Sequence, residues 1–153
     1  MQWASQTIIP KVLQMGVHPN YLYRMTTIFA ITTMAPSLNT ATVTAESSVL
    51  DTVLSLHEDL IPNIRFNVAK AFEVLAAVLS QDAAGRQVVA SKVIPALERL
   101  KADSDADVRF FAAKALEVAT VAEKQAVPLP APPQQGTNAA AEVGAGAAKP
   151  LGQ

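Results

Sequence analysis

The fold is decided by residues 94–118, IPALERLKADSDADVRFFAAKALEV, where two apolar helix-like segments flank an acidic turn. Ser104 can cap the second helix, and Asp107, three residues later, completes a capping-box-like pair with it. Asp105 and Asp107 also suit the positive end of the helix dipole. The stretch therefore predicts one helical hairpin.

The same hairpin occurs twice more upstream. Residues 59–71 align with residues 103–115 without a gap, and residues 18–30 form a more divergent copy. The anchor arginines of the three copies are Arg24, Arg65 and Arg109, which are 41 and 44 residues apart. A period of this length with two helices per unit is typical of HEAT and armadillo repeats. The sequence predicts an all-α solenoid of about three HEAT repeats, each an antiparallel helix pair.

The three repeats are predicted at about 3–40, 44–82 and 85–122, so that residues 1–122 form the array. After this point the composition changes, and residues 126–153 contain five prolines, many alanines and glycines, and only two charged side chains. Such a segment has no periodic apolar face to offset the entropy of ordering. Residues 123–153 are therefore predicted to be a disordered tail.

Several helix boundaries follow from local signals. Asn20 can cap the second helix of repeat one, and Pro62 can begin the second helix of repeat two. Pro10 and Pro95 each lie fourteen residues before an anchor arginine, which predicts a recurrent bend in the first helix of repeats one and three. Residues 35–44 are predicted to be a linker. The core face of the second helix of repeat two is predicted to comprise Ile64, Val68, Ala71, Phe72, Leu75, Val78 and Leu79.

Composition bounds the function. The chain has 153 residues, half of them apolar, a net charge of −1 and no cysteine. Such a charge gives no field that would favour nucleic acid or an anionic membrane. No apolar run reaches membrane-spanning length, and residues 1–6 lack the pattern of a signal peptide. We therefore expect neither nucleic acid nor membrane as a partner, and a cytoplasmic or nuclear location.

Catalytic and metal-binding motifs have little support. The two histidines, His18 and His57, lie near inter-helix turns, and neither belongs to a metal-binding spacing. No nucleophile elbow and no phosphate-binding glycine loop is present. Both histidines are expected to be exposed turn residues. The chain is predicted not to be an enzyme and to need no cofactor or metal.

The turns admit a structural and a functional interpretation. Arg65 and Arg109 are predicted to be structural, reaching back to the turn aspartates Asp59 and Asp103 and to neighbouring repeats. Turns that stack along one side of a solenoid form a continuous surface, so partner binding is weighed equally with structure at the turn tips. These tips are Pro19, Tyr21, Leu60, Ile61, Asn63, Asp105 and Ala106. Leu60 and Ile61 are expected to be exposed, because neither has an obvious place in the core.

Several strings resemble the scaffolding A subunit of protein phosphatase 2A. They are WA at residue 3, TIIPKVL at 7–13, PNYL-x-RMTT at 19–27 and NIRFNVAK at 63–70. The resemblance covers residues 3–122 and corresponds to the last three of the fifteen HEAT repeats of that family. It departs from the family in the added tail and in the absence of the upstream repeats.

The resemblance implies a scaffold that docks a serine/threonine phosphatase catalytic subunit through its intra-repeat turns. Regulatory subunits of the phosphatase would bind only if the missing N-terminal repeats were present. The contacts implied for the catalytic subunit are His18, Pro19, Asn20, Tyr21, Arg24, Asp59, Leu60, Ile61, Asn63, Asp103, Asp105 and Asp107. The alternative is a generic HEAT-repeat adaptor, for example of nuclear-transport type, with an unrelated protein partner.

Overall fold

The computed structural model describes the backbone of residues 2–131 and the side chains of residues 7–131. The described part of the chain contains helices and turns and no strand. The helices are α1 (Gln2–Gln14), α2 (Tyr21–Met34), α3 (Thr40–Thr44), α4 (Val49–Leu56), α5 (Pro62–Leu79), α6 (Ala83–Val88), α7 (Ile94–Lys101) and α8 (Ala106–Ala122). Short 3-10 turns follow α1 at Met15–Val17 and α2 at Ala35–Ser37, and a π-helical turn, Val89–Val93, joins α6 to α7.

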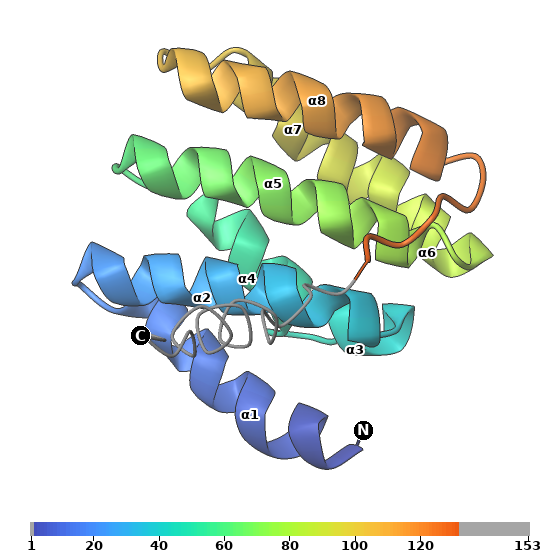
Figure 1. Cartoon of the computed structure of the whole chain (residues 1–153), viewed down its shortest axis with the longest axis horizontal. Helices are drawn as coiled ribbons and strands as arrows, with labels where there is room; N and C mark the ends of the chain where they lie inside the picture. Colours follow the sequence, from blue (N-terminus) through green and yellow to red (C-terminus); the bar gives the residue numbers. More distant parts are fainter. Residues whose placement is uncertain (1, 132–153) are drawn as a thin grey trace, which may run out of the picture.

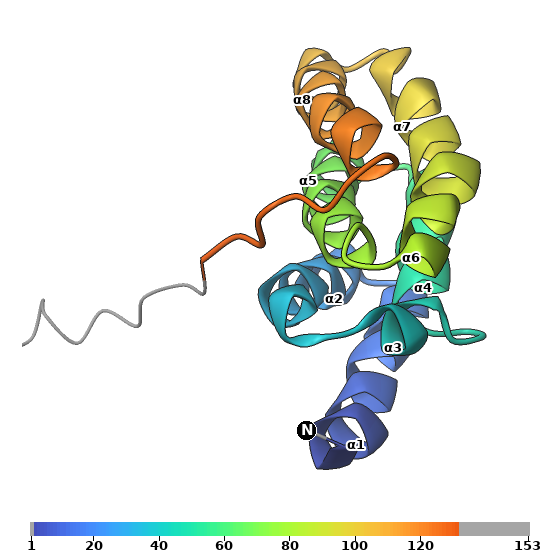
Figure 2. The ribbon, with the colours of Figure 1, turned by 90° about the vertical axis from the view of Figure 1, so that its right-hand side faces the viewer.

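The helices form two layers. The second helices of the three repeats, α2, α5 and α8, stack in one layer, and α1, α4 and the α6–α7 segment form the other (Figures 1 and 2). We call these the B layer and the A layer. Each A-layer helix turns back into its B-layer partner at the left of Figure 1. This arrangement is the α-solenoid that the repeated hairpins predicted.

The core lies where each repeat packs on the next. Helix α5 is the central element, because it packs on α2, on α4 and on α8. All seven residues of its predicted core face are buried, so the helical period of the sequence located this face correctly. Helix α8 packs on both α5 and α7, and several of its buried side chains are alanines (Ala112, Ala115 and Ala119), whose small size permits close helix packing. Burying this apolar surface is the main stabilising contribution to the array.

Two predictions about the A layer need correction. The linker predicted at 35–44 contains the short helix α3, because Asn39 accepts a hydrogen bond from the Thr42 amide and Val43 is buried in the core. The pattern of apolar residues also predicts the first helix of repeat two over about 45–57, whereas α4 is shorter and begins only at Val49. Sequence periodicity could not detect α3 because five residues are too few to show it.

The two recurrent prolines have different surroundings. Pro10 lies inside α1, whereas Pro95 lies in the first turn of α7, directly after the π-helical turn. The backbone stays helical from α6 through the π-helical turn into α7, so Pro95 removes a backbone donor inside a continuous helical segment. In repeat three, the bend predicted at the proline is therefore replaced by a change from α-helix to π-helix at Val89–Val93, and Pro95 lies just after this π-helical turn.

Gly85 allows α6 to cross closely over the end of α5. A Cβ atom added at Gly85 would lie 1.9 Å from the carbonyl oxygen of Leu79, which is far inside van der Waals contact. The Gly85 amide also donates to Asp82 Oδ1 at 2.7 Å, which fixes the start of α6. The glycine is required here by the approach of two backbones.

We expect Gly85→Ala to destabilise the array by about 2 kcal/mol, because the new methyl group must push two backbone segments apart. Urea unfolding followed by circular dichroism measures the change. Ala84→Gly is the matched control, since Ala84 is exposed and the substitution removes a methyl group without a clash. Equal midpoints for Gly85→Ala and the wild-type chain would contradict the close approach.

The tail does not leave the array at residue 123. After α8 ends, residues 124–131 turn back past α5 and then run outward from the B layer (Figure 2). The Val127 amide donates to Ser80 Oγ at 3.0 Å, and Gln81 Nε2 donates to the Val127 carbonyl at 2.8 Å. The prediction of disorder from residue 123 is therefore wrong for this first part. Residues 132–153 lie outside the described residues, and disorder there stays a prediction.

Candidate functional site: the turn edge

The three A–B turns share one backbone arrangement. His18, Asp59 and Asp103 each stand six residues before an anchor arginine, and each side chain accepts a hydrogen bond from the amide two residues later. The distances are 3.0 Å for His18 Nδ1, 3.0 Å for Asp59 Oδ1 and 2.9 Å for Asp103 Oδ1. Short polar side chains often stabilise turns in this way. His18 thus replaces an aspartate as turn former in repeat one.

Each anchor arginine also closes its own turn. Nη1 of Arg24 donates to the carbonyls of His18 and Pro19, each at 2.9 Å. Arg65 makes the same contact with the carbonyl of Asp59 at 2.8 Å, and Arg109 with those of Asp103 and Ser104. The arginine therefore satisfies turn carbonyls that no helix satisfies.

In Arg24 and Arg65, the remaining guanidinium nitrogens, Nε and Nη2, bind an aspartate of the neighbouring repeat. Arg24 holds Asp59 of the next repeat in a bidentate pair, with Nε at 2.8 Å and Nη2 at 3.2 Å from the two carboxylate oxygens. Arg65 holds Asp103 in the same way, at 2.8 and 3.0 Å. We call these two pairs the rungs. Their side chains are between 8% and 17% exposed, so both rungs are largely shielded from water.

The second rung determines the charge states of Arg65 and Asp103. The hydrogen bond with Arg65 is the largest influence on the Asp103 carboxyl and lowers its pKa. Burial opposes this lowering of the pKa to a lesser extent, and the hydrogen bond from the Asp105 amide adds to the lowering. The same hydrogen bond with Asp103 raises the pKa of Arg65. Both groups are therefore charged throughout the neutral range. A bidentate pair of this kind adds geometric specificity as well as stabilisation.

Two helix caps complete the turns. Asn20 accepts from the Leu22 amide at 3.0 Å and caps α2, as predicted. Helix α8 is capped by Asp105, whose Oδ1 accepts from the amides of Asp107 and Val108. The predicted capping box of Ser104 and Asp107 is therefore wrong. Residues 103–107, DSDAD, contain several side chains that could cap α8. The turn formed by Asp103 places Asp105 at the start of the helix, so Asp105 is the residue that caps it.

The predicted site residues thus fall into two groups. Arg24, Asp59, Arg65 and Asp103 have their polar atoms engaged within the array, by the rungs and the turns. The residues that remain open to solvent are His18, Pro19, Asn20, Tyr21, Leu60, Asn63, Asp107 and Arg109. Ile61 is partly buried against the core, so the expectation that it would be exposed is wrong, and Asp105 is partly buried as the cap of α8.

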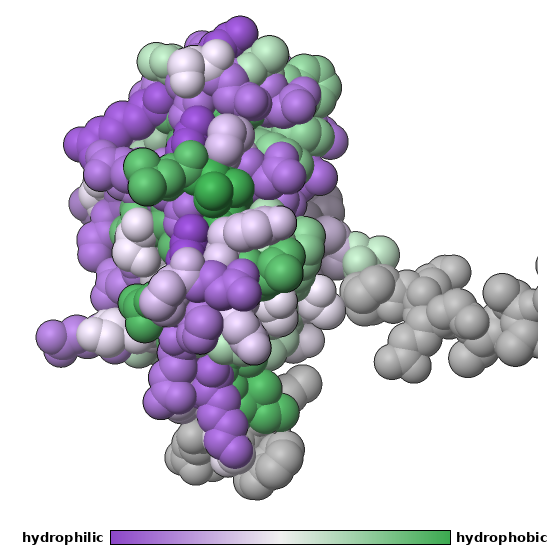
Figure 3. Space-filling model, turned by 90° about the vertical axis from the view of Figure 1, so that its left-hand side faces the viewer, coloured by the Kyte–Doolittle hydropathy of each residue, from purple (hydrophilic) through white to green (hydrophobic). Residues whose placement is uncertain are grey.

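Exposed apolar side chains gather along the same line. Leu60 is 91% exposed at the tip of the second turn, and Phe110 is 64% exposed in the first part of α8. Val17, Tyr21, Leu22 and Tyr23 are exposed at the first turn. We call the surface formed by these six residues and the turns the turn edge. Figure 3 looks onto this side of the molecule and shows apolar patches among polar side chains.

Sequence reasoning missed three features of the turn edge. It did not identify Leu22 and Phe110 as exposed, because both lie in strongly apolar strings. It expected His57 to be exposed, yet the ring is largely buried, and Nδ1 bonds to the Leu54 carbonyl. His57 also lines a cavity of about 350 Å³ between the second and third turns, together with Leu60, Arg99 and the second rung. Contacts between turns that are some forty residues apart leave no local signal.

The described residues carry no sign of a metal or membrane site. Within residues 2–131, no group of three or more histidine and carboxylate side chains is placed to hold a metal ion. None of the described helices is both long enough and apolar enough to cross a bilayer.

Stacked hairpins with inter-repeat rungs define this chain as an α-solenoid of HEAT repeats. No protein-family model matches it. Several curated proteins are similar to it in sequence. One of them is the regulatory A subunit of protein phosphatase PP2A of Schizosaccharomyces pombe, which is 62% identical over 77 residues. That match covers 50% of this chain and 13% of the relative. The corresponding protein of Saccharomyces cerevisiae is 35% identical over 117 residues, which is 74% of this chain and 18% of the relative.

A human relative extends the comparison. The A beta isoform of the 65 kDa regulatory subunit of serine/threonine-protein phosphatase 2A is 38% identical over 62 residues, covering 40% of this chain and 10% of that protein. The helical array therefore belongs to the family of PP2A regulatory A subunits, as its sequence strings indicated. These relatives are named as regulatory subunits, and the prediction that the chain is not an enzyme agrees with those names. The chain spans less than a fifth of the length of these relatives.

Proposed function

We propose that this chain is a scaffold module whose turn edge binds the catalytic subunit of a serine/threonine phosphatase. The observation that carries the proposal is the set of exposed apolar side chains on and beside turns whose backbones are fixed from within. Leu60 and Phe110 are the most exposed of these in repeats two and three. Large apolar side chains held open on a rigid frame are typical of protein-binding surfaces.

The rungs support the proposal by their rigidity. The second and third turns are each held by their own arginine and by the arginine of the preceding repeat. A partner that binds such turns loses little free energy to ordering loops, because the loops are already ordered. In this function the chain does no chemistry. It would position the catalytic subunit relative to other proteins.

The names of the relatives support the choice of partner. Each is called a regulatory subunit of PP2A, a phosphatase, so the catalytic subunit of such a phosphatase is the first partner to test. Regulatory subunits of the complex remain predicted to need repeats upstream of those present here. The cytoplasmic or nuclear location follows from the same proposal.

We expect Leu60→Asp to weaken binding of a purified catalytic subunit of PP2A type by about tenfold or more, because it places a charge in the apolar contact. Tyr21→Ala should have an effect in the same direction. Surface plasmon resonance with the immobilised chain measures both. Phe29→Asp is the matched control, since Phe29 is an exposed aromatic of α2 outside the turn edge. The melting temperatures of all variants should stay close to that of the wild-type chain.

Two results would contradict the proposal. In the first, the wild-type chain does not bind the catalytic subunit. In the second, Phe29→Asp weakens binding as much as Leu60→Asp does. The second result would assign the contact to the open face of the B layer, and the turn residues would then be structural.

A further inference from the structure

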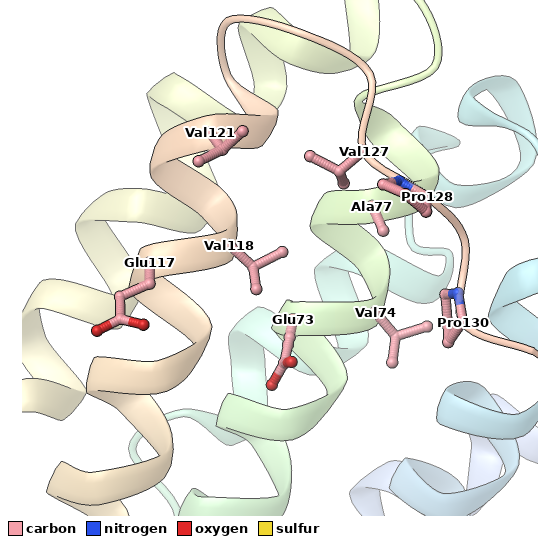
Figure 4. A pocket seen from close by; sticks show the side chains of 9 residues that line it. All are labelled: Glu73, Val74, Ala77, Glu117, Val118, Val121, Val127, Pro128 and Pro130. Carbon is pink, nitrogen blue, oxygen red and sulfur yellow. The ribbon is translucent and has the colours of Figure 1, made fainter.

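A second surface lies away from the turn edge, in the groove between α5 and α8. Its cavity, of about 430 Å³, is lined by apolar side chains of both helices, among them Val74, Ala77, Val118 and Val121. Residues 127–130, which we call the strap, cover one end of this groove (Figure 4). Glu73 and Glu117 flank the other end, which the strap leaves open.

The strap is held by its main chain at one residue. Val127 donates its amide proton to Ser80 Oγ and accepts from Gln81 Nε2 through its carbonyl, at 3.0 and 2.8 Å. Its side chain is partly buried against the core. Ser80 is itself fully buried, so its hydroxyl oxygen is fixed at the end of α5. The groove therefore offers one hydrogen-bond acceptor and one donor to the main chain of an extended residue with an apolar side chain.

The strap uses little of the groove. Pro128, Leu129 and Pro130 remain exposed, although Pro128 and Pro130 touch the cavity wall. A proline-rich segment is already extended before it binds, so little free energy is lost in ordering it. A segment held by one anchor residue can also leave. The strap therefore resembles a ligand bound in a site more than it resembles a structural part of the core.

We propose that the groove between α5 and α8 binds an extended partner segment of Val-Pro-x-Pro type, and that the strap is its intramolecular competitor. Ser80 Oγ would accept from an amide of the partner and Gln81 Nε2 would donate to a carbonyl of the partner, as they do with Val127, and the apolar floor would select a small branched side chain. Glu73 and Glu117 disfavour an acidic segment. The proposal does not depend on the phosphatase as partner, because the turn edge and the groove are separate surfaces.

Competition by the strap sets the expected affinities. A short flexible tether gives the attached segment an effective concentration on the order of millimolar. A free peptide at micromolar concentration should therefore not displace an intact strap. A substitution that releases the strap should open the groove to the same peptide.

The test uses the full chain and a labelled peptide of residues 124–131, KQAVPLPA, in fluorescence anisotropy. We expect the peptide to bind Val127→Asp about tenfold or more tightly than it binds the wild-type chain. Leu129→Asp is the matched control, because Leu129 is exposed and lies outside the cavity wall, and it should behave like the wild type. A peptide carrying aspartate in place of the valine should bind none of them.

Equal binding of the peptide to all three chains, or binding to none, would overturn the proposal. Circular dichroism checks that Val127→Asp keeps the helical content of the wild type. If that variant does not fold, hydrogen exchange of the wild-type chain decides. Millimolar peptide must then speed exchange of the Val127 amide, and unchanged exchange would show that the strap is a fixed part of the fold.

Discussion

Ala71→Glu is expected to unfold repeat two at room temperature. Ala71 is fully buried on the predicted core face of α5, where that helix packs between its neighbours. A glutamate here would bring a carboxylate into the hydrophobic core. The free energy of unfolding should fall by about 4–5 kcal/mol, which is a large part of the stability of a domain of this size.

Far-ultraviolet circular dichroism and urea titration measure this loss. Ala84→Glu is the matched control, because it makes the same chemical change at an exposed position in the first turn of α6. The control should leave the unfolding midpoint within experimental error of the wild type. A cooperative transition for Ala71→Glu near the wild-type midpoint would mean that α5 can rotate or shift to expose this position.

Asp103→Ala is expected to lower the free energy of unfolding by about 3 kcal/mol, the lower end of the effect of breaking a buried ion pair. The substitution removes the second rung and leaves Arg65 largely buried without its carboxylate. It also removes the side chain that accepts the Asp105 amide, so the turn before α8 loosens. Ser104→Ala is the control, since Ser104 is exposed and caps no helix.

The pH dependence provides a separate measurement on the same variant. The folded-state pKa of Asp103 lies below its ordinary value, so the unfolded chain binds a proton first as the pH falls. The stabilisation by the rung is therefore complete above about pH 5 and is lost as the pH drops through the lowered pKa. The difference in unfolding free energy between wild type and Asp103→Ala should shrink steadily as the pH falls below about 5. A constant difference over this range would show that the carboxylate charge contributes nothing.

The sequence predicted the features that repeat. The arginine spacing indicated the number of repeats, and the period of α5 located its buried face. Asn20 and Pro62 marked two helix starts correctly. These signals are strong because each depends on residues that are close in the chain or recur at one register.

Features made by neighbouring repeats were not predictable in the same way. The sequence pairs Arg65 with Asp59 as readily as with Asp103, and only the stacking of the helices assigns the carboxylates to the arginine of the preceding repeat. Gly85 is required by a backbone that lies six residues away, and Val127 finds its partners at Ser80 and Gln81. Each depends on distance in space, for which a single sequence gives no pattern.

The rungs give the array a direction. Arg24 and Arg65 each reach toward the aspartate of the repeat that follows, so the two ends of the described array carry different unmatched groups. At one end His18 occupies the aspartate position, and at the other Arg109 has no carboxylate partner among the described residues. The series of rungs is thus polar: each rung runs from the arginine of one repeat to the aspartate of the repeat that follows, so each rung fixes both the order and the relative orientation of the two repeats that it joins.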